Sequence, residues 1–116
     1  MNTTKRNSTG ESTDPALTTT QIFELLAHER RQLVLKTLRW AVGAVHVSDI
    51  ADYLALCEGE HTYNQYERIC TGLVHTHLPK LADFGVIEYD PEQETVVLQN
   101  TADQLYPYLD LAESSN

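Results

Sequence analysis

The stretch VHTHLPKLADFGVIEYD, residues 74–90, decides how this chain is expected to fold. Its apolar residues recur at the three- and four-residue spacing of a helix, through a proline and up to Gly85. After this glycine, apolar and polar residues alternate, as they do in a strand. A helix that ends at a glycine and is followed at once by a strand is therefore expected near the centre of the fold.

This helix is predicted to begin after Thr62, which forms a capping-box pattern with Gln65. The residues that share one arc of the helical wheel are Tyr63, Tyr66, Cys70, Val74, His77, Leu78 and Leu81. We expect one helix over residues 63–84, weakened at Gly72 and kinked at Pro79, which lacks an amide hydrogen. A break, with a new helix starting near Pro79, is the alternative.

Two amphipathic helices are predicted nearer the amino terminus. Their inward residues are Ile22, Leu25 and Leu26 in the first, and Val34, Leu35, Leu38 and Ala41 in the second. We expect Thr20 to be the N-cap of the first helix and Gly43 to end the second.

A short strand over residues 45–47 and a third helix should follow. Ser48 is the predicted N-cap of this helix, and Asp49 suits the positive end of its dipole. Its predicted inward residues are Ile50, Ala51 and Leu54.

The segments VIEYD (86–90) and TVVL (95–98) should form a hairpin, with Pro91 at the first central position of a type I turn. Thr101 and Gln104 repeat the capping-box pattern at the start of a last helix, with Pro107 as a site for a kink. The residues that align on that helix are Leu105, Tyr108, Leu109 and Ala112. The predicted class is mainly α with a small β-hairpin (α+β).

Length and composition favour one small domain, since the chain has 116 residues, of which 41% are hydrophobic. We expect a domain over residues 20–99 and a helix over 100–113, with disordered tails at 1–19 and 114–116. No apolar run approaches the roughly 18 residues of a membrane span, and the amino terminus lacks the apolar centre of a signal peptide. A cytoplasmic protein is therefore expected, and two cysteines are too few for a disulfide framework.

The charge balance is acidic, with a net charge of −9. Residues 20–100 hold six basic and twelve acidic side chains, a balance of −6. An acid excess with few lysines suits a cell interior of concentrated salt, where charges are screened within a few ångströms. A soluble acidic protein without that habitat is the alternative. For DNA binding, this charge is unfavourable.

Neither an enzyme nor a metal site is expected. The chain has no G-x-S-x-G, no phosphate-binding glycine loop and no H-E-x-x-H. We expect Arg30 and Arg31 to pair with Glu24 or to bind carbonyls at the end of the first helix, and Trp40 and the tyrosines to lie in the core or in interfaces.

Zinc-type ligands are present, but their spacing argues against a site. The candidates are Cys57, His61, Cys70, His75 and His77. Cys57 and His61 could share a helical face. His75 and His77 point in opposite directions on a helix, so one ion cannot bind both.

These motifs resemble the arsenic-repressor-type (ArsR-like) winged helix-turn-helix family over about residues 20–98. The matching segments are LLAHERRQLVLKTL, VSDIADYL and the pattern V-x-x-H-L-x-x-L-x-x-x-G followed by a wing. The proline after His77-Leu78, the acidity and the closing Tyr-Asp resemble most a haloarchaeal branch of uncharacterised function. The ArsR-like cysteine metal motif is absent, so no cofactor is expected.

The resemblance implies a DNA-reading helix. Its base-reading half corresponds to Thr71, Gly72, His75 and Thr76, and Arg68 and Lys80 could meet phosphate. Ordinary solvent-facing residues are an equally good interpretation of this set. The resemblance thus suggests a DNA-binding transcriptional regulator of a halophilic archaeon, acting on double-stranded DNA.

Three features depart from the family: the acidic wing EYDPEQET, Asp83 on the outward face, and a connection CEGEHTYNQYE that is stretched. They favour an alternative, an adaptor that binds another protein through the Ile69/Leu73 surface or through the wing. A homodimer is expected through the first and last helices. The predicted interface residues are Ile22, Phe23, Leu26, Leu105, Tyr108 and Leu109.

Overall fold

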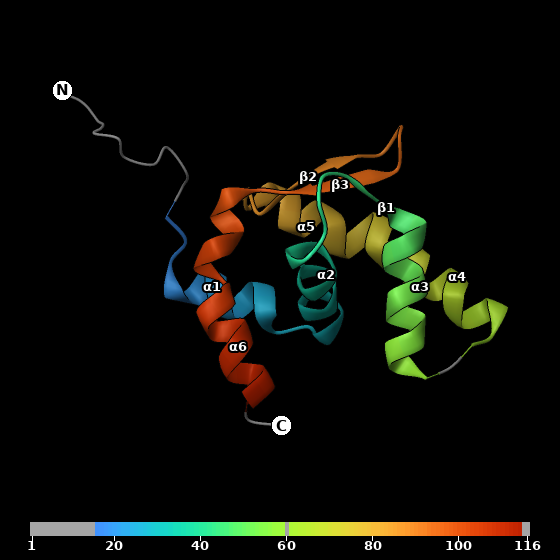
Figure 1. Cartoon of the computed structure of the whole chain (residues 1–116), viewed down its shortest axis with the longest axis horizontal. Coiled ribbons are helices and arrows are strands. Elements are labelled where there is room, and N and C mark those ends of the chain that lie inside the picture. Colours follow the sequence, from blue (N-terminus) through green and yellow to red (C-terminus); the bar gives the residue numbers. More distant parts are fainter. Residues whose placement is uncertain (1–15, 60, 115–116) are drawn as a thin grey trace.

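The computed structural model describes residues 16–59 and 61–114, and its fold is mainly helical with a small three-stranded antiparallel sheet (Figure 1). This is the predicted α+β class. The helical elements are α1 (Thr19–Leu26), α2 (Glu29–Arg39), α3 (Val47–Glu58), α4 (Tyr63–Gly72), the π-helix η1 (Leu73–His77), α5 (Leu78–Asp83), the 3-10 helix η2 (Asn100–Gln104) and α6 (Tyr106–Ser114). The strands are β1 (Val45–His46), β2 (Ile87–Asp90) and β3 (Thr95–Leu98).

The sheet has the strand order β1-β3-β2. β2 and β3 form the predicted hairpin, with Ile87 opposite Leu98, and β1 pairs with β3 at Val45 and Val96. The hairpin turn projects beyond the helices (Figure 1). We call this hairpin, residues 87–98, the wing. Sequence analysis predicted the hairpin and the short strand, but not that they would join in one sheet.

The core is formed by leucine, isoleucine and valine side chains from the helices and the sheet. Its largest fully buried side chains are Leu25, Leu35, Ile50, Leu54, Ile69, Leu73, Leu78, Leu81, Leu105, Leu109, Val34 and Val86. The predicted inward face of α3 is confirmed. Because Leu105 and Leu109 belong to this core, the carboxyl-terminal segment is an integral part of it.

The helix predicted over 63–84 runs without a break through α4, η1 and α5, with right-handed helical dihedrals at both junctions. In η1 the amide of Leu78 donates to the carbonyl of Leu73, five residues earlier. Such a π turn adds one residue to the helix, which is common where the regular ladder is disturbed. Pro79 follows this π turn directly. It does not begin a separate helix, because α5 continues η1 without a break.

The π turn shifts the phase of the buried face. After it, His77, Leu78 and Leu81 are buried as predicted. Before it, the buried residues are Gln65, Ile69 and Leu73. Of the predicted set, Tyr66 and Cys70 are partly buried against the core, whereas Tyr63 and Val74 are exposed. The prediction was wrong for Tyr63 and Val74, because it assumed one uninterrupted helical period over the whole helix.

Several predicted element ends were also wrong. The N-cap of α1 is Thr18, which forms a full capping box with Gln21, so Thr20 lies inside the helix. The N-cap position of α3 is His46, and Ser48 lies within its first turn. Thr101 lies inside η2 rather than capping one continuous helix, because Pro107 allows α6 to begin only at Tyr106.

The second helix is shorter than predicted, since α2 ends at Arg39 and Ala41 is exposed beyond it. Trp40 is not a core residue, because 80% of it is exposed. The predicted tail over 1–19 lies outside the described residues up to position 15. Leu17, by contrast, packs against the core, and its amide donates to Gln104 Oε1 at 2.8 Å.

Two predicted helix ends are confirmed. Thr62 is the N-cap of α4 and accepts from the Gln65 amide at 3.1 Å. Gly85, with a φ of +75°, follows α5, and the amides of Gly85 and Val86 donate to the carbonyls of Ala82 and Leu81, both at 3.0 Å. This is the Schellman pattern of a helix that ends at glycine. The connection from α3 to α4 is residues 59–62, so it is not stretched as predicted.

Candidate nucleic-acid interface

Four of the residues predicted to bind DNA lie exposed on one helix. They are Arg68 and Thr71 on α4, and His75 and Thr76 on η1. Their positions follow from the opposite face of this helix, where Ile69, Leu73 and His77 are buried. The structure thus brings these four side chains to the solvent side of a helix that the core holds firmly.

Gly72 does not belong with them. A Cβ atom built at Gly72 would lie 3.5 Å from Arg30 Nη1 and 3.7 Å from His77 Cδ2. Its open side therefore faces α2 and the ring of His77 rather than solvent. The expectation that Gly72 shares the base-reading face with Thr71, His75 and Thr76 was therefore wrong.

A charged network joins this helix to α2 and α3. Arg30 donates to both carboxylate oxygens of Glu58, at 2.7 and 3.0 Å. Gln65 donates to the same carboxylate and accepts from Arg68 Nη2 at 2.8 Å. The hydrogen bond from Arg30 is the main reason why the pKa of Glu58 is lowered. The network therefore fixes the position of Arg68 at the edge of the exposed face.

A second polar contact lies beneath η1. Arg31 is buried, and it donates to the carbonyls of Leu25 and Glu24 at 2.8 and 2.9 Å. The predicted binding of carbonyls at the end of the first helix is confirmed for Arg31, whereas Arg30 pairs with Glu58 instead. Arg31 Nη1 also lies 3.2 Å from His77 Nδ1, which must be the acceptor because a guanidinium has only donors.

His77 is held in its neutral form. Burial, and then the charges of His28, Arg31 and Arg30, lowers its pKa to about 4. Its ring lies 4.3 Å, centroid to centroid, from that of His28, which caps α2 by accepting from the Arg30 amide. The His77 ring therefore packs against His28 and accepts a hydrogen bond from Arg31 inside the fold.

Lys80 is committed to another side chain. Its Nζ forms an ion pair with Glu24 and lies 5.5 Å from the centre of the Phe84 ring. Arg39 is likewise paired, with Asp110 at 2.6 Å. These cations are balanced by carboxylates of the same chain. Arg68 is thus the cation that the described structure leaves most open to a partner on this face.

The wing carries the opposite charge. Its exposed carboxylates are Glu88, Asp90, Glu92 and Glu94. Asp90 organises the turn, since its Oδ1 accepts from the amides of Glu92 and Gln93 at 3.0 and 3.1 Å. The wing therefore presents negative charge beside the exposed helix, as the sequence predicted.

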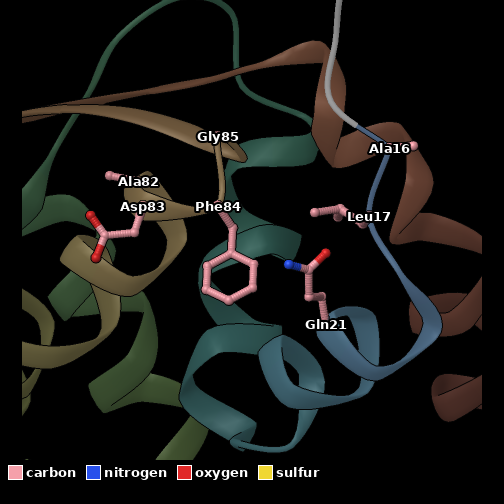
Figure 2. Close-up of a pocket in the computed structure, with 7 residues that line it drawn as sticks. All are labelled: Ala16, Leu17, Gln21, Ala82, Asp83, Phe84 and Gly85. Atoms are coloured by element: carbon pink, nitrogen blue, oxygen red, sulfur yellow. The ribbon is translucent and has the colours of Figure 1, made fainter.

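A hollow of about 360 Å³, lined mostly by uncharged residues, opens between the start of α1 and the end of α5 (Figure 2). Asp83 is the only ionisable residue among the described residues that line it, and in Figure 2 the Phe84 ring lies between Asp83 and the Gln21 amide. Across residues 16–59 and 61–114, no three His, Cys, Asp or Glu side chains are placed to hold a metal ion. In the same residues, no helix is long and apolar enough to cross a membrane.

One known protein family matches most of the chain. The family described as Domain of unknown function (DUF7344) matches residues 23–97, well over half of the chain. The chain belongs to the DUF7344 family. No curated protein and no solved structure matches it significantly. The DUF7344 match runs from α1 to β3 and includes the exposed helix and the wing, whereas α6 lies outside it.

The predicted dimer residues of this DUF7344 chain divide into two groups. Ile22, Leu105 and Leu109 are buried within the single chain and cannot meet a second one. Leu26 packs at the edge of the core, and Phe23 and Tyr108 are exposed, with their rings 6.0 Å apart and edge to face. The prediction was wrong for the buried three because α1 and α6 already cover each other inside one chain.

The predicted adaptor surface at Ile69 and Leu73 was also wrong. Both side chains are fully buried in the DUF7344 core, again because the π turn shifts the phase of α4. Glu58, which joins Arg30 to Gln65 across three helices, was not among the predicted residues. No spacing rule could have found it, since the bonded residues lie 28 and 7 positions apart.

Proposed function

We propose that the chain is a winged helix-turn-helix domain that binds double-stranded DNA as a transcriptional regulator, without a cofactor. The observation that carries the proposal is the element order α2, β1, α3, α4 with its continuation, β2 and β3, combined with the strand order β1-β3-β2. The connection over residues 59–62 has about the length of the turn in helix-turn-helix proteins. The second helix of such a pair enters the major groove.

In this proposal the exposed face of α4 and η1 contacts the bases. Threonine hydroxyls and histidine nitrogens form hydrogen bonds with base edges, which suits Thr71, His75 and Thr76. Arg68 would contact phosphate from the edge of the face. Lys80 could contact phosphate only if its ion pair with Glu24 were broken, which would reduce the free energy gained from that contact.

The acidity of the chain sets the conditions for binding. Most DNA-binding proteins gain affinity by releasing counterions from phosphate, and this gain falls as salt rises. Here the balance of −6 over residues 20–100 repels phosphate in dilute solution. In molar salt, screening shortens to about 3 Å, so the repulsion fades while contacts to base edges persist. The proposal therefore places the protein in the cytoplasm of a cell that accumulates salt.

A homodimer is part of the proposal. A largely apolar surface groove of about 380 Å³ lies between α1, α2 and α6, and it is lined by Phe23, Leu26, Gln32, Tyr108, Leu111 and Ala112. A second copy packed here by two-fold symmetry would bury the same groove on both chains. Two reading helices would then be expected about 34 Å apart, one turn of DNA.

The second candidate function is a protein-binding adaptor. The acidic wing favours it, because carboxylates at Glu88, Asp90, Glu92 and Glu94 would repel phosphate next to the reading helix. Such a wing suits a basic protein surface. In this case the chain would have the fold of a DNA-binding domain but would not bind DNA. One fold can serve different functions.

A selection experiment separates the two functions. The full chain is immobilised and mixed with a random duplex library and a cell lysate in near-molar potassium chloride. Enrichment of a palindromic duplex supports the regulator. Retention of a lysate protein without enrichment of any duplex supports the adaptor and contradicts DNA binding, provided that variants of the wing no longer retain this protein.

A further inference from the structure

A cleft of about 270 Å³ lies between the exposed helix, the start of α3 and the wing. Tyr66, Cys70 and Val74 form its helical wall, and Tyr89 and Glu94 form its wing wall. The amide of Val47 donates to the carbonyl of Glu94 at 2.9 Å, which closes the cleft at the foot of the wing. Apolar cavities of about 150 Å³ already hold a benzene ring, so this cleft can hold a small organic molecule.

The helical wall of the cleft is aromatic and apolar, and its polar groups, the Tyr66 hydroxyl and the Cys70 thiol, are uncharged. Burial, the hydrogen bond with Cys70 and nearby carboxylates raise the pKa of Tyr66 to about 12. Burial likewise raises the pKa of the Cys70 thiol. At neutral pH the helical wall therefore presents a phenol, a thiol and a valine side chain.

One carboxylate, that of Glu94, lines the cleft itself. The negative charges of Asp52 and Glu67 also help to raise the pKa values of Tyr66 and Cys70. The cleft thus combines tyrosine rings with negative charge at its rim, which is the combination that binds organic ammonium groups.

We propose that this cleft binds a small organic cation, an ammonium group carrying apolar carbon substituents. The apolar walls and tyrosine rings take the substituents, and Glu94 at the rim balances the charge. Anionic aromatic molecules of the same size are repelled. Binding at this cleft stands independently of whether the chain binds DNA.

The test uses choline as the probe and the two cysteines of the full chain as reporters. Cys70 lines the cleft, whereas Cys57 is exposed on α3 and serves as the internal control. Alkylation of each thiol by N-ethylmaleimide is followed by mass spectrometry, while choline chloride replaces potassium chloride at constant ionic strength. We expect saturable slowing at Cys70 and an unchanged rate at Cys57.

Charge selection is tested with 3,3-dimethylbutan-1-ol, a neutral molecule of the same shape, and with wing variants. Glu94→Gln should weaken choline binding about two- to five-fold, the usual range for one exposed charge pair. Glu92→Gln, on the same turn but outside the cleft, should leave it unchanged. Equal protection by the neutral alcohol, equal effects of the two variants, or parallel slowing of both thiols would overturn the proposal.

A second readout covers the case in which Cys70 does not react at all. Ring resonances of Tyr66 and Tyr89 are then followed by NMR during the choline titration. Both should shift with one shared saturation curve, and Tyr63, which is exposed outside the cleft, should not. Unshifted Tyr66 and Tyr89 resonances would contradict the proposal.

Discussion

Arg31 and His77 form the polar centre of the contact between α1, α2 and η1. One guanidinium satisfies two carbonyls at the end of α1 and donates to a ring that is 4% exposed. A buried hydrogen bond of this kind contributes modestly when made and costs about 1–3 kcal/mol when one partner is left alone. The contact therefore depends on His77 staying neutral.

We predict that this histidine makes the protein less stable in acid. The folded pKa of His77 is about 4, below its ordinary value of 6.5, so the unfolded chain binds the proton more readily between these values. The contribution of the neutral ring is complete above about pH 6.5 and is lost as pH falls towards 4. Urea denaturation across this window should show a slope of at most roughly 1.4 kcal/mol per pH unit from this group.

His77→Gln should flatten that slope, because glutamine can accept from Arg31 without titrating. His75→Gln, two residues away on the exposed side, should keep the slope of the unaltered protein. If both variants retain the full slope, His77 does not control the acid response.

A second residue-scale prediction concerns packing. Leu81 is fully buried in α5, so Leu81→Ala should lower the free energy of unfolding by about 2–5 kcal/mol. Lys80→Ala removes the partly exposed pair with Glu24 and the contact with the Phe84 ring, and should cost about 0–1 kcal/mol. Equal midpoints for the two variants in thermal melts would refute the assignment of the buried face.

At the scale of elements, the long helix separates what the sequence predicts from what it does not. Its capping residue Thr62, its terminal Gly85 and its buried face after the π turn follow local rules of spacing and backbone conformation. The buried face before the turn does not, because a single extra residue rotates it by about 100°. Pro79 marks a disturbed helix in the sequence, but a kink, a break and a π turn leave the same local pattern.

This extra residue leads to a deletion prediction. In a Pro79→Ala background, which restores the missing amide, deletion of Thr76 should turn η1 into regular helix and keep every buried side chain in place. Deletion of Glu67 from regular α4 in the same background should rotate Gln65 and the residues before it out of their contacts. By urea denaturation, the Glu67 deletion should be the less stable protein. The reverse order would contradict the role given to the π turn.

At the scale of the whole molecule, burial decides which surface a second copy could use. The exposure of Arg68, Thr71, His75 and Thr76 on one helix was predictable from the sequence. The hydrogen-bond network at Glu58 and the burial of Leu105 and Leu109 within one chain were not predictable. Both depend on contacts between residues that lie far apart in the sequence. Removing α6 would therefore expose the core as well as any interface.

A surface substitution is the better test of the dimer. Leu111 is 68% exposed in the groove between α1 and α6, so Leu111→Glu should leave folding intact and yield a monomer in sedimentation experiments. Leu56→Glu on α3, where the leucine is 66% exposed, is the matched control and should remain dimeric. A dimer that persists in the Leu111 variant would place the interface elsewhere.

The central claim, that the exposed helix reads DNA in spite of an acidic surface, is tested most directly by titrating the selected duplex across potassium chloride from dilute to several molar. We predict that affinity depends weakly on salt or rises with it, since few cations are open to phosphate. His75→Ala and Thr76→Ala should each reduce discrimination by about 1–3 kcal/mol per lost base contact, whereas Lys80→Ala should weaken all duplexes alike. Failure to bind any duplex at any potassium concentration would contradict the claim.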